Sequence, residues 1–240
     1  MGIATSDATR LRHVTRPMRP TAPRAGGRGE PYPAVMDPAD ELVECRMLVP
    51  DAGVDSLTEN LLALCGPGAD LVGAALDVAA RAHEQHRRDE GKPYIVHPLR
   101  VAGSLANVGV SAEVCAAALL HDVIEDAPRH AAEVHALGPR VAALVDALTE
   151  DWGEWPEEYY GRIVAAGEDA ARIKLADRID NLRFVHLTGP AKQVRYLRET
   201  NRHFGGIVAT ARLPELGDAL VALLQWNHDR LSENSGDGYT

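Results

Sequence analysis

Apolar residues recur at the three- and four-residue spacing of helices along most of this 240-residue chain. No stretch alternates apolar and polar residues for long enough to predict a strand. Gly109, Pro128 and Gly189-Pro190 mark breaks in the pattern, because Gly ends helices and Pro does not continue them. Helices are expected near residues 70–87, 97–108, 111–124, 131–149, 156–166, 168–187, 190–211 and 215–232.

The composition agrees with an all-α fold. Aromatic residues make up only 5% of the chain, and the 45% of hydrophobic residues are mostly Ala, Leu and Val, which favours closely packed helices. The formal net charge of −10 argues against a general binder of nucleic acid or anionic membranes. It leaves room for a small nucleotide held by a metal and a local arginine.

The dipeptide His121-Asp122 follows an apolar run, and Glu125 and Asp126 come one helical turn later on the same face. Burying carboxylates costs several kcal/mol unless they are paired or bind a metal. Imidazole nitrogen and carboxylate oxygen are ordinary ligands of divalent cations. The segment therefore indicates a metal site, with a helix end carrying solvated acids as the alternative.

Two other segments contain candidate ligands. His97 precedes a proline, which favours an extended residue followed by a helix start; taken alone, it would be a capping or surface residue. Asp177 and Asn181 are four residues apart, on one stripe close to an apolar face. Asp177 alone is equally compatible with an ion pair to Lys174 or Arg178.

Four motifs follow one another along the chain: Ala82–Pro98, Leu119–Asp126, Leu144–Thr149 and Lys174–Leu182. Together they resemble the motifs of the HD-domain metal-dependent phosphohydrolases. The resemblance covers roughly residues 70–230 and is strongest to the hydrolase domain of the RelA/SpoT alarmone enzymes and their small single-domain homologues. It implies an all-α HD-domain helical bundle.

The resemblance also implies the roles of individual residues. One metal ion, usually Mn²⁺ in the alarmone hydrolases, would be held by His97, His121, Asp122 and Asp177. The attacking water would be oriented and deprotonated by Glu125 and Asp126. The nucleotide would be contacted by Arg88 and Asn181. The implied activity is removal of the 3′-pyrophosphate from guanosine tetra- or pentaphosphate, (p)ppGpp, in the stringent response.

One stretch departs from the resemblance. Five acidic residues and no Lys or Arg occur between Glu150 and Glu158, where characterised alarmone hydrolases usually carry basic residues. Another nucleotide or phosphate ester is therefore an alternative substrate. A non-catalytic, metal-bound nucleotide sensor is a third hypothesis, against which the retained Glu125-Asp126 pair weighs.

The aromatic residues Trp152, Trp155 and Tyr159 lie in the same stretch. We expect them to pack against the helical core, with base stacking as the alternative. The downstream Lys174, Arg178 and Arg183 would either restore positive charge near the site or form ion pairs on helix surfaces.

The chain is expected to comprise a disordered Arg/Pro/Gly-rich arm, a poorly defined lead-in segment, the HD domain and a flexible tail, at residues 1–35, 36–69, 70–232 and 233–240. The arm has no apolar run, which predicts no secretory signal and no membrane anchor; the alternative to a disordered arm is an upstream start codon, with Met18 or Met36 as the true start. Three scattered cysteines without a Cys-x-x-Cys pair fit a reducing cytoplasm. Oligomeric state is left open.

Overall fold

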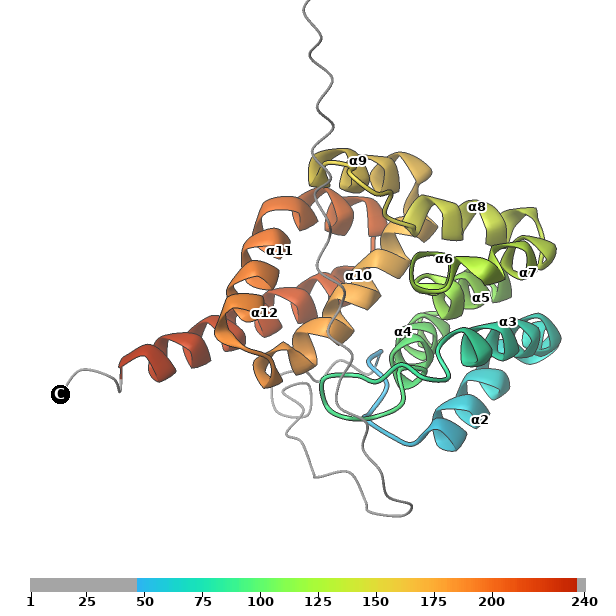
Figure 1. Cartoon of the computed structure of the whole chain (residues 1–240), viewed down its shortest axis with the longest axis horizontal. Helices are drawn as coiled ribbons and strands as arrows, with labels where there is room; N and C mark the ends of the chain where they lie inside the picture. The colour runs from blue at the N-terminus through green and yellow to red at the C-terminus, as the bar shows by residue number, and fades with distance from the viewer. Residues whose placement is uncertain (1–46, 237–240) are drawn as a thin grey trace, which may run out of the picture.

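All regular structure in the described residues, 47–236, is helical in the computed structural model (Figure 1). No strand occurs among these residues, and one isolated bridge joins Arg87 to Pro93. The predicted all-α fold is therefore confirmed. The α-helices are α2 (Val54–Cys65), α3 (Ala69–Ala82), α4 (Val96–Asn107), α5 (Ala112–Leu120), α6 (Val123–Asp126), α7 (Ala131–Ala136), α8 (Pro139–Leu148), α9 (Pro156–Ala166), α10 (Glu168–Phe184), α11 (Pro190–Ala211) and α12 (Pro214–Gly236).

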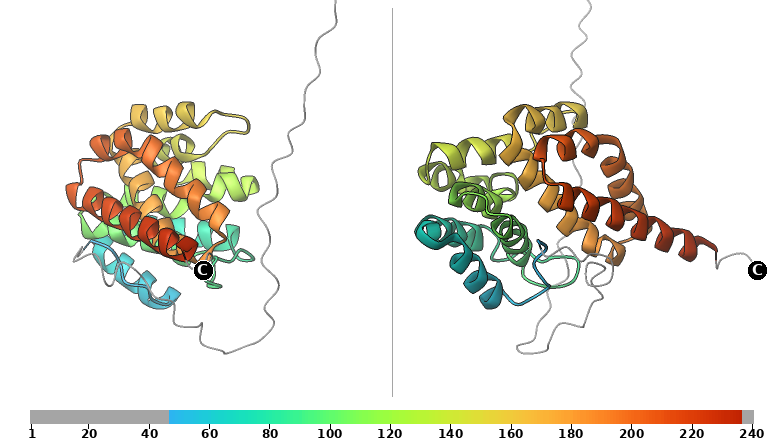
Figure 2. Two further views of the ribbon diagram at one scale, coloured as in Figure 1. Left: turned by 90° about the vertical axis from the view of Figure 1, so that its left-hand side faces the viewer. Right: turned by 180° about the vertical axis from the view of Figure 1, so that it is seen from behind.

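Helix α10 runs through the middle of the bundle and packs against α4, α5, α8, α9, α11 and α12, as the three views show (Figures 1 and 2). Because it is covered on several sides, α10 lacks the single apolar stripe of a surface helix. Its buried residues include the charged Asp177, Arg178 and Asp180. Such groups are retained in an interior only when they are paired or bind ions.

The apolar run before His121 forms α5, in which every residue from Val114 to Leu120 is buried. This helix packs against α3, α4 and α8. It ends at Leu120, so the helix predicted over 111–124 is interrupted, and His121 and Asp122 form the turn before α6. Both side chains therefore project from a turn and not from a continuous helix face.

Three other predicted boundaries differ from the structure. The first predicted helix ends at Ala82, because His83 begins a run of turns. Helix α4 begins at Val96, so His97 is in the first helical turn and the extended conformation predicted for it is wrong. The helix predicted over 131–149 is two helices, because Gly138 has φ 126°, a conformation that favours Gly.

The N-terminal lead-in contributes to the core. Leu57 and Leu61 of α2 are buried, and α2 packs against α3 and α4. The stretch Val54–Ala82 is long and apolar enough to cross a membrane by length and hydropathy, but here it forms α2 and α3, separated by a short 3₁₀ turn. The predictions for residues 1–35, for 36–46 and for the end of the tail, 237–240, lie outside the described residues; up to Gly236 the chain continues α12.

The predicted aromatic packing is right for one residue of three. Tyr159 is buried, whereas Trp152 and Trp155 are 79% and 70% exposed. Both Trp residues lie in the loop before α9, while the core side of α9 is filled by Tyr159, Tyr160 and Ile163. The prediction that the Trp side chains pack against the core is therefore wrong.

Candidate metal centre and substrate pocket

The four predicted metal ligands come from separate elements and meet in the interior. His97 lies in α4, His121 and Asp122 in the turn after α5, and Asp177 in α10. The Nε2 atoms of His97 and His121 lie 3.3 and 3.6 Å from Oδ1 of Asp177. They lie 3.9 and 3.4 Å from Oδ2 of Asp122. Atoms bound to one ion at about 2.0–2.2 Å stand roughly 3–3.6 Å apart, so small adjustments would complete a shared centre.

The hydrogen bonds of the two imidazoles direct their lone pairs at this centre. Nδ1 of His97 donates to Asp180 over 2.6 Å, and Nδ1 of His121 donates to the carbonyl of Ala118 over 2.7 Å. Both Nε2 atoms are buried without a hydrogen-bond partner. A neutral imidazole anchored in this way is the form that binds a metal, so the residues present fit a divalent cation.

Electrostatics around the centre also favour a cation. Burial opposes ionisation of Asp177, but Lys174, 2.9 Å from its Oδ2, and both imidazoles outweigh burial and hold the pKa of Asp177 well below its usual range. Burial likewise opposes the charged form of His121, yet Asp122 and Asp177 raise its pKa to about 9, so a metal ion would bind here by displacing the proton that these carboxylates attract to the ring. The protein thus presents ionised carboxylates that require a positive partner.

A buried ion-pair network behind His97 was not predicted. The guanidinium of Arg100 lies 2.6 Å from Asp180 and 3.0 Å from both Glu90 and Asp51. Asp180 in turn fixes the His97 ring. The sequence held one indication of this network. Arg100 follows His97 by three residues and Asp180 follows Asp177 by three, which places the members of each pair on one helix face.

One other group at the centre was not predicted: the Tyr94 hydroxyl, which donates to Oδ2 of Asp122. Lys174, considered as an ion-pair partner of Asp177, is half-buried and lies 2.9 Å from that carboxylate. By contrast, Arg178 pairs with Glu199 and Tyr160, away from the ligands. Of the three basic residues considered, Lys174 is therefore the one that directly contacts a ligand carboxylate.

The two predicted water-activating acids lie on α6, immediately after Asp122. The backbone N–H of Asp126 donates to the carbonyl of Asp122 over 2.9 Å. Glu125 and Asp126 are both half-buried, which leaves them accessible to water. The ligand atoms that lie within 4.8 Å of one another belong to His97, His121 and Asp177, so Glu125 and Asp126 stand outside this cluster, as does Asp122.

The two predicted nucleotide contacts form a chain leading to the metal centre. Arg88 donates to Oδ1 of Asn181 over 3.1 Å, and Asn181 donates to Oδ1 of Asp177 over 2.6 Å. Both line a small pocket that also includes Lys192 and Tyr196. This pocket therefore offers guanidinium, ammonium and phenol groups beside the ligand carboxylate.

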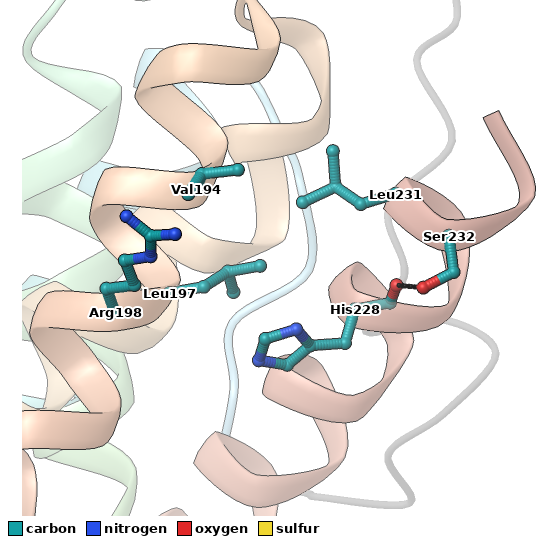
Figure 3. Close-up of a pocket in the computed structure, with 6 residues that line it drawn as sticks. All are labelled: Val194, Leu197, Arg198, His228, Leu231 and Ser232. Atoms are coloured by element: carbon teal, nitrogen blue, oxygen red, sulfur yellow. Dashed lines mark hydrogen bonds between the residues drawn. The ribbon is translucent and has the colours of Figure 1, made fainter. Parts of the chain in front are cut away.

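A larger hollow lies elsewhere. A groove of about 360 Å³ between α11 and α12 is lined by Val194, Leu197, Arg198, His228, Leu231 and Ser232 (Figure 3). It contains none of the predicted site residues. Size alone would point to this groove, but the predicted nucleotide contacts Arg88 and Asn181 line the smaller pocket, and Asn181 donates to the ligand carboxylate of Asp177.

The acidic stretch neutralises part of its own charge. Glu154 pairs with Arg162 over 2.6 Å, and Glu157 pairs with Arg202 over 2.6 Å. These arginines come from α9 and α11 and not from the substrate pocket. The stretch therefore supplies no basic groups to a polyphosphate, as its sequence indicates.

Comparisons with known proteins agree with this geometry. Residues 75–153 match the family model described as the HD domain. The "guanosine-3′,5′-bis(diphosphate) 3′-pyrophosphohydrolase" of Aquifex aeolicus is 36% identical over 150 residues, 59% of this chain and 22% of that protein. The "bifunctional (p)ppGpp synthase/hydrolase SpoT" of Escherichia coli K12 is 40% identical over 134 residues, 51% of this chain and 19% of that protein. The chain thus spans about a fifth of these curated relatives.

A solved structure extends the likeness to 65% of this chain. It is described as a metazoan ortholog of SpoT that hydrolyses ppGpp, and it is similar with a TM-score of 0.58 and 27% identity, covering 65% of this chain and 94% of that one. The matched residues 75–153 include His97, His121 and Asp122, and the fold adds Asp177 to them. Residues 75–153 therefore match the HD domain, and the helical fold is similar to that of a relative described as hydrolysing ppGpp.

Proposed function

We propose that this protein is a metal-dependent phosphohydrolase that removes the 3′-pyrophosphate from (p)ppGpp in the cytoplasm, using Mn²⁺ as its metal. The observation that supports it most is the pair of buried, unpartnered imidazole nitrogens facing the carboxylates of Asp122 and Asp177. The choice of (p)ppGpp as substrate rests on the names of the relatives described above. Cys65 and Cys115 are free thiols, in keeping with a reducing compartment.

In this proposal, His97, His121, Asp122 and Asp177 hold the ion. A divalent cation bound there would lower the pKa of water and neutralise charge on a phosphate oxygen. Glu125 and Asp126 then take the proton as water attacks the phosphorus next to the 3′ oxygen. The bond from phosphorus to the 3′ oxygen breaks, so ppGpp and water give GDP and pyrophosphate.

Glu125→Gln tests the proton acceptor. The amide keeps the shape of the side chain but cannot take a proton, so turnover should fall by about 10²-fold, the usual size of a general-base contribution. Metal content should not change. The control is Glu59→Gln on the exposed side of α2, and turnover as high as in that control would remove Glu125 from the mechanism.

Arg88→Lys tests the substrate contact. A guanidinium binds phosphate oxygens through two parallel hydrogen bonds, which an ammonium cannot reproduce. Since a hydrogen bond to a charged group contributes about 1.5–3 kcal/mol, kcat/KM should fall roughly 10- to 100-fold with metal content unchanged. The matched control is Arg87→Lys, because exposed Arg87 donates to the backbone carbonyls of Glu84 and His86; equal rates in the two variants would contradict the assignment.

Metal removal tests whether the ion joins α4, α5 and α10. Metal present at 100 times its Kd stabilises the folded state by about 2.7 kcal/mol. For a domain of this size, EDTA should therefore lower the Tm of the Mn²⁺-loaded protein by about 5–10 °C. Differential scanning fluorimetry measures this shift, and an unchanged Tm would show that the ion contributes nothing to the fold.

The acidic stretch favours a second candidate, hydrolysis of another nucleotide or phosphate ester. A screen with Mn²⁺ against ppGpp, pppGpp, NADPH and common nucleotides decides between them, provided that phosphate and pyrophosphate are followed separately. Pyrophosphate from ppGpp supports the proposal. Turnover of another nucleotide, with none of ppGpp, would identify that nucleotide as the substrate. Metal binding without any turnover favours a nucleotide sensor.

A further inference from the structure

We propose that His83, His86 and Asp126 form a second divalent-metal site beside the first. Ligand atoms of these three residues lie within 4.8 Å of one another. They come from the end of α3, the turn that follows it, and α6, which packs against α3. This proposal does not rest on the proposed hydrolysis, because it is tested by the number of bound ions and not by turnover.

The spacing of the ligand atoms suits an octahedral ion. Nδ1 of His83 lies 3.0 Å from Nδ1 of His86 and 4.0 Å from Oδ2 of Asp126. With bonds of about 2.1 Å, adjacent octahedral ligands stand about 3.0 Å apart and opposite ligands about 4.2 Å apart. The two imidazoles thus match adjacent positions, and His83 and Asp126 match nearly opposite ones.

The surroundings favour a cation. The C-terminus of the 14-residue helix α3 points to the site, since His83 is its C-cap, and a helix C-terminus carries partial negative charge. His86 and Asp126 are half-buried, which gives an ion and its waters a way in.

One ring separates the two centres. Tyr94 packs on His83 with centroids 4.6 Å apart, and its hydroxyl donates to Asp122. Asp126 follows Asp122 by one helical turn. A second ion would thus lie next to the water that Glu125 and Asp126 are proposed to activate. Asp126 would contribute one oxygen ligand to this ion.

Ion counting tests the proposal. Metal-free protein is equilibrated with excess Mn²⁺, and bound ions are measured by equilibrium dialysis and mass spectrometry. His86→Phe keeps a ring against Tyr94 but removes the nitrogen ligand, and Asp126→Asn weakens the site from the other side. We expect two ions in the native chain, one in each of these variants, one in His121→Ala, and none in His86→Phe combined with His121→Ala.

His135→Phe is the control, because His135 is exposed and pairs with Asp146 outside both centres; it should keep two ions. Electron paramagnetic resonance gives a second readout, since neighbouring Mn²⁺ ions broaden each other's signals and His86→Phe should abolish that coupling. Circular dichroism verifies that each variant is folded. The same ion count in the native chain, His86→Phe and Asp126→Asn would overturn the proposal and leave the two imidazoles as a simple N–H···N hydrogen bond.

Discussion

His121→Ala is expected to abolish metal binding at the centre formed with His97, Asp122 and Asp177, and to lower turnover by at least about 10³-fold. The reason is chemical. A bound divalent ion lowers the pKa of water from 15.7 to about 7, and without it neither the nucleophile nor the charge on the phosphate is stabilised. Among the described residues the Nε2 of His121 makes no hydrogen bond, but it lies 3.4 Å from Asp122 and 3.6 Å from Asp177, so circular dichroism must verify that the variant is folded.

The measurement is turnover and ion content of the same preparation. His135→Ala, which removes an exposed histidine paired with Asp146, is the control and should behave like the native chain. A His121→Ala variant that is folded and lacks the ion, yet turns over at the native rate, would contradict the mechanism.

Arg100→Leu is expected to destabilise the protein by about 3–5 kcal/mol, the usual effect of breaking a buried ion pair from one side. Arg100 is fully buried, and its guanidinium lies over the ring of Phe184. Its removal leaves the buried carboxylates of Asp180 and Glu90 without their principal cation. Because Asp180 orients His97, metal affinity should fall as well.

Urea denaturation measures this effect as a shift of the midpoint at constant m. The control is Arg140→Leu, whose partner Asp169 forms an ion pair near the surface and should contribute no more than about 1 kcal/mol. Equal losses in the two variants would mean that the Arg100 network is no more important than a surface pair.

Much of the fold could be predicted, because helical periodicity and Gly/Pro breaks are local signals. The misplaced boundaries depend on features outside that pattern. Gly138 has the spacing of an ordinary helical residue, and its positive φ is visible only in the structure. Trp152 and Trp155 are apolar enough for a core, but they lie in the loop before α9, and the core side of that helix is formed by Tyr159 and Tyr160.

The candidate site could be predicted as far as its motifs extend. His97, His121, Asp122 and Asp177 were expected together, and the structure brings them together. The residues that orient them, Asp180 behind His97 and Tyr94 behind Asp122, lie within the motifs, but their contacts depend on tertiary packing and could not be predicted from the sequence.

His83 and His86 illustrate a different limit. The helix predicted over 70–87 would place them on one face, because they are three residues apart. The structure ends α3 before His86 and brings both rings to Asp126, 40 positions or more along the chain. Such proximity is a property of tertiary packing and has no signature in the local sequence.

The most direct measurement is the product released from ppGpp as metal is returned to the metal-free protein. Chromatography should show equimolar GDP and pyrophosphate, at a rate that rises with Mn²⁺ occupancy of the His97–His121–Asp122–Asp177 centre and stays at background in His121→Ala. If the metal-loaded protein instead releases no pyrophosphate from ppGpp and hydrolyses no other phosphate ester, the proposed hydrolase function is wrong.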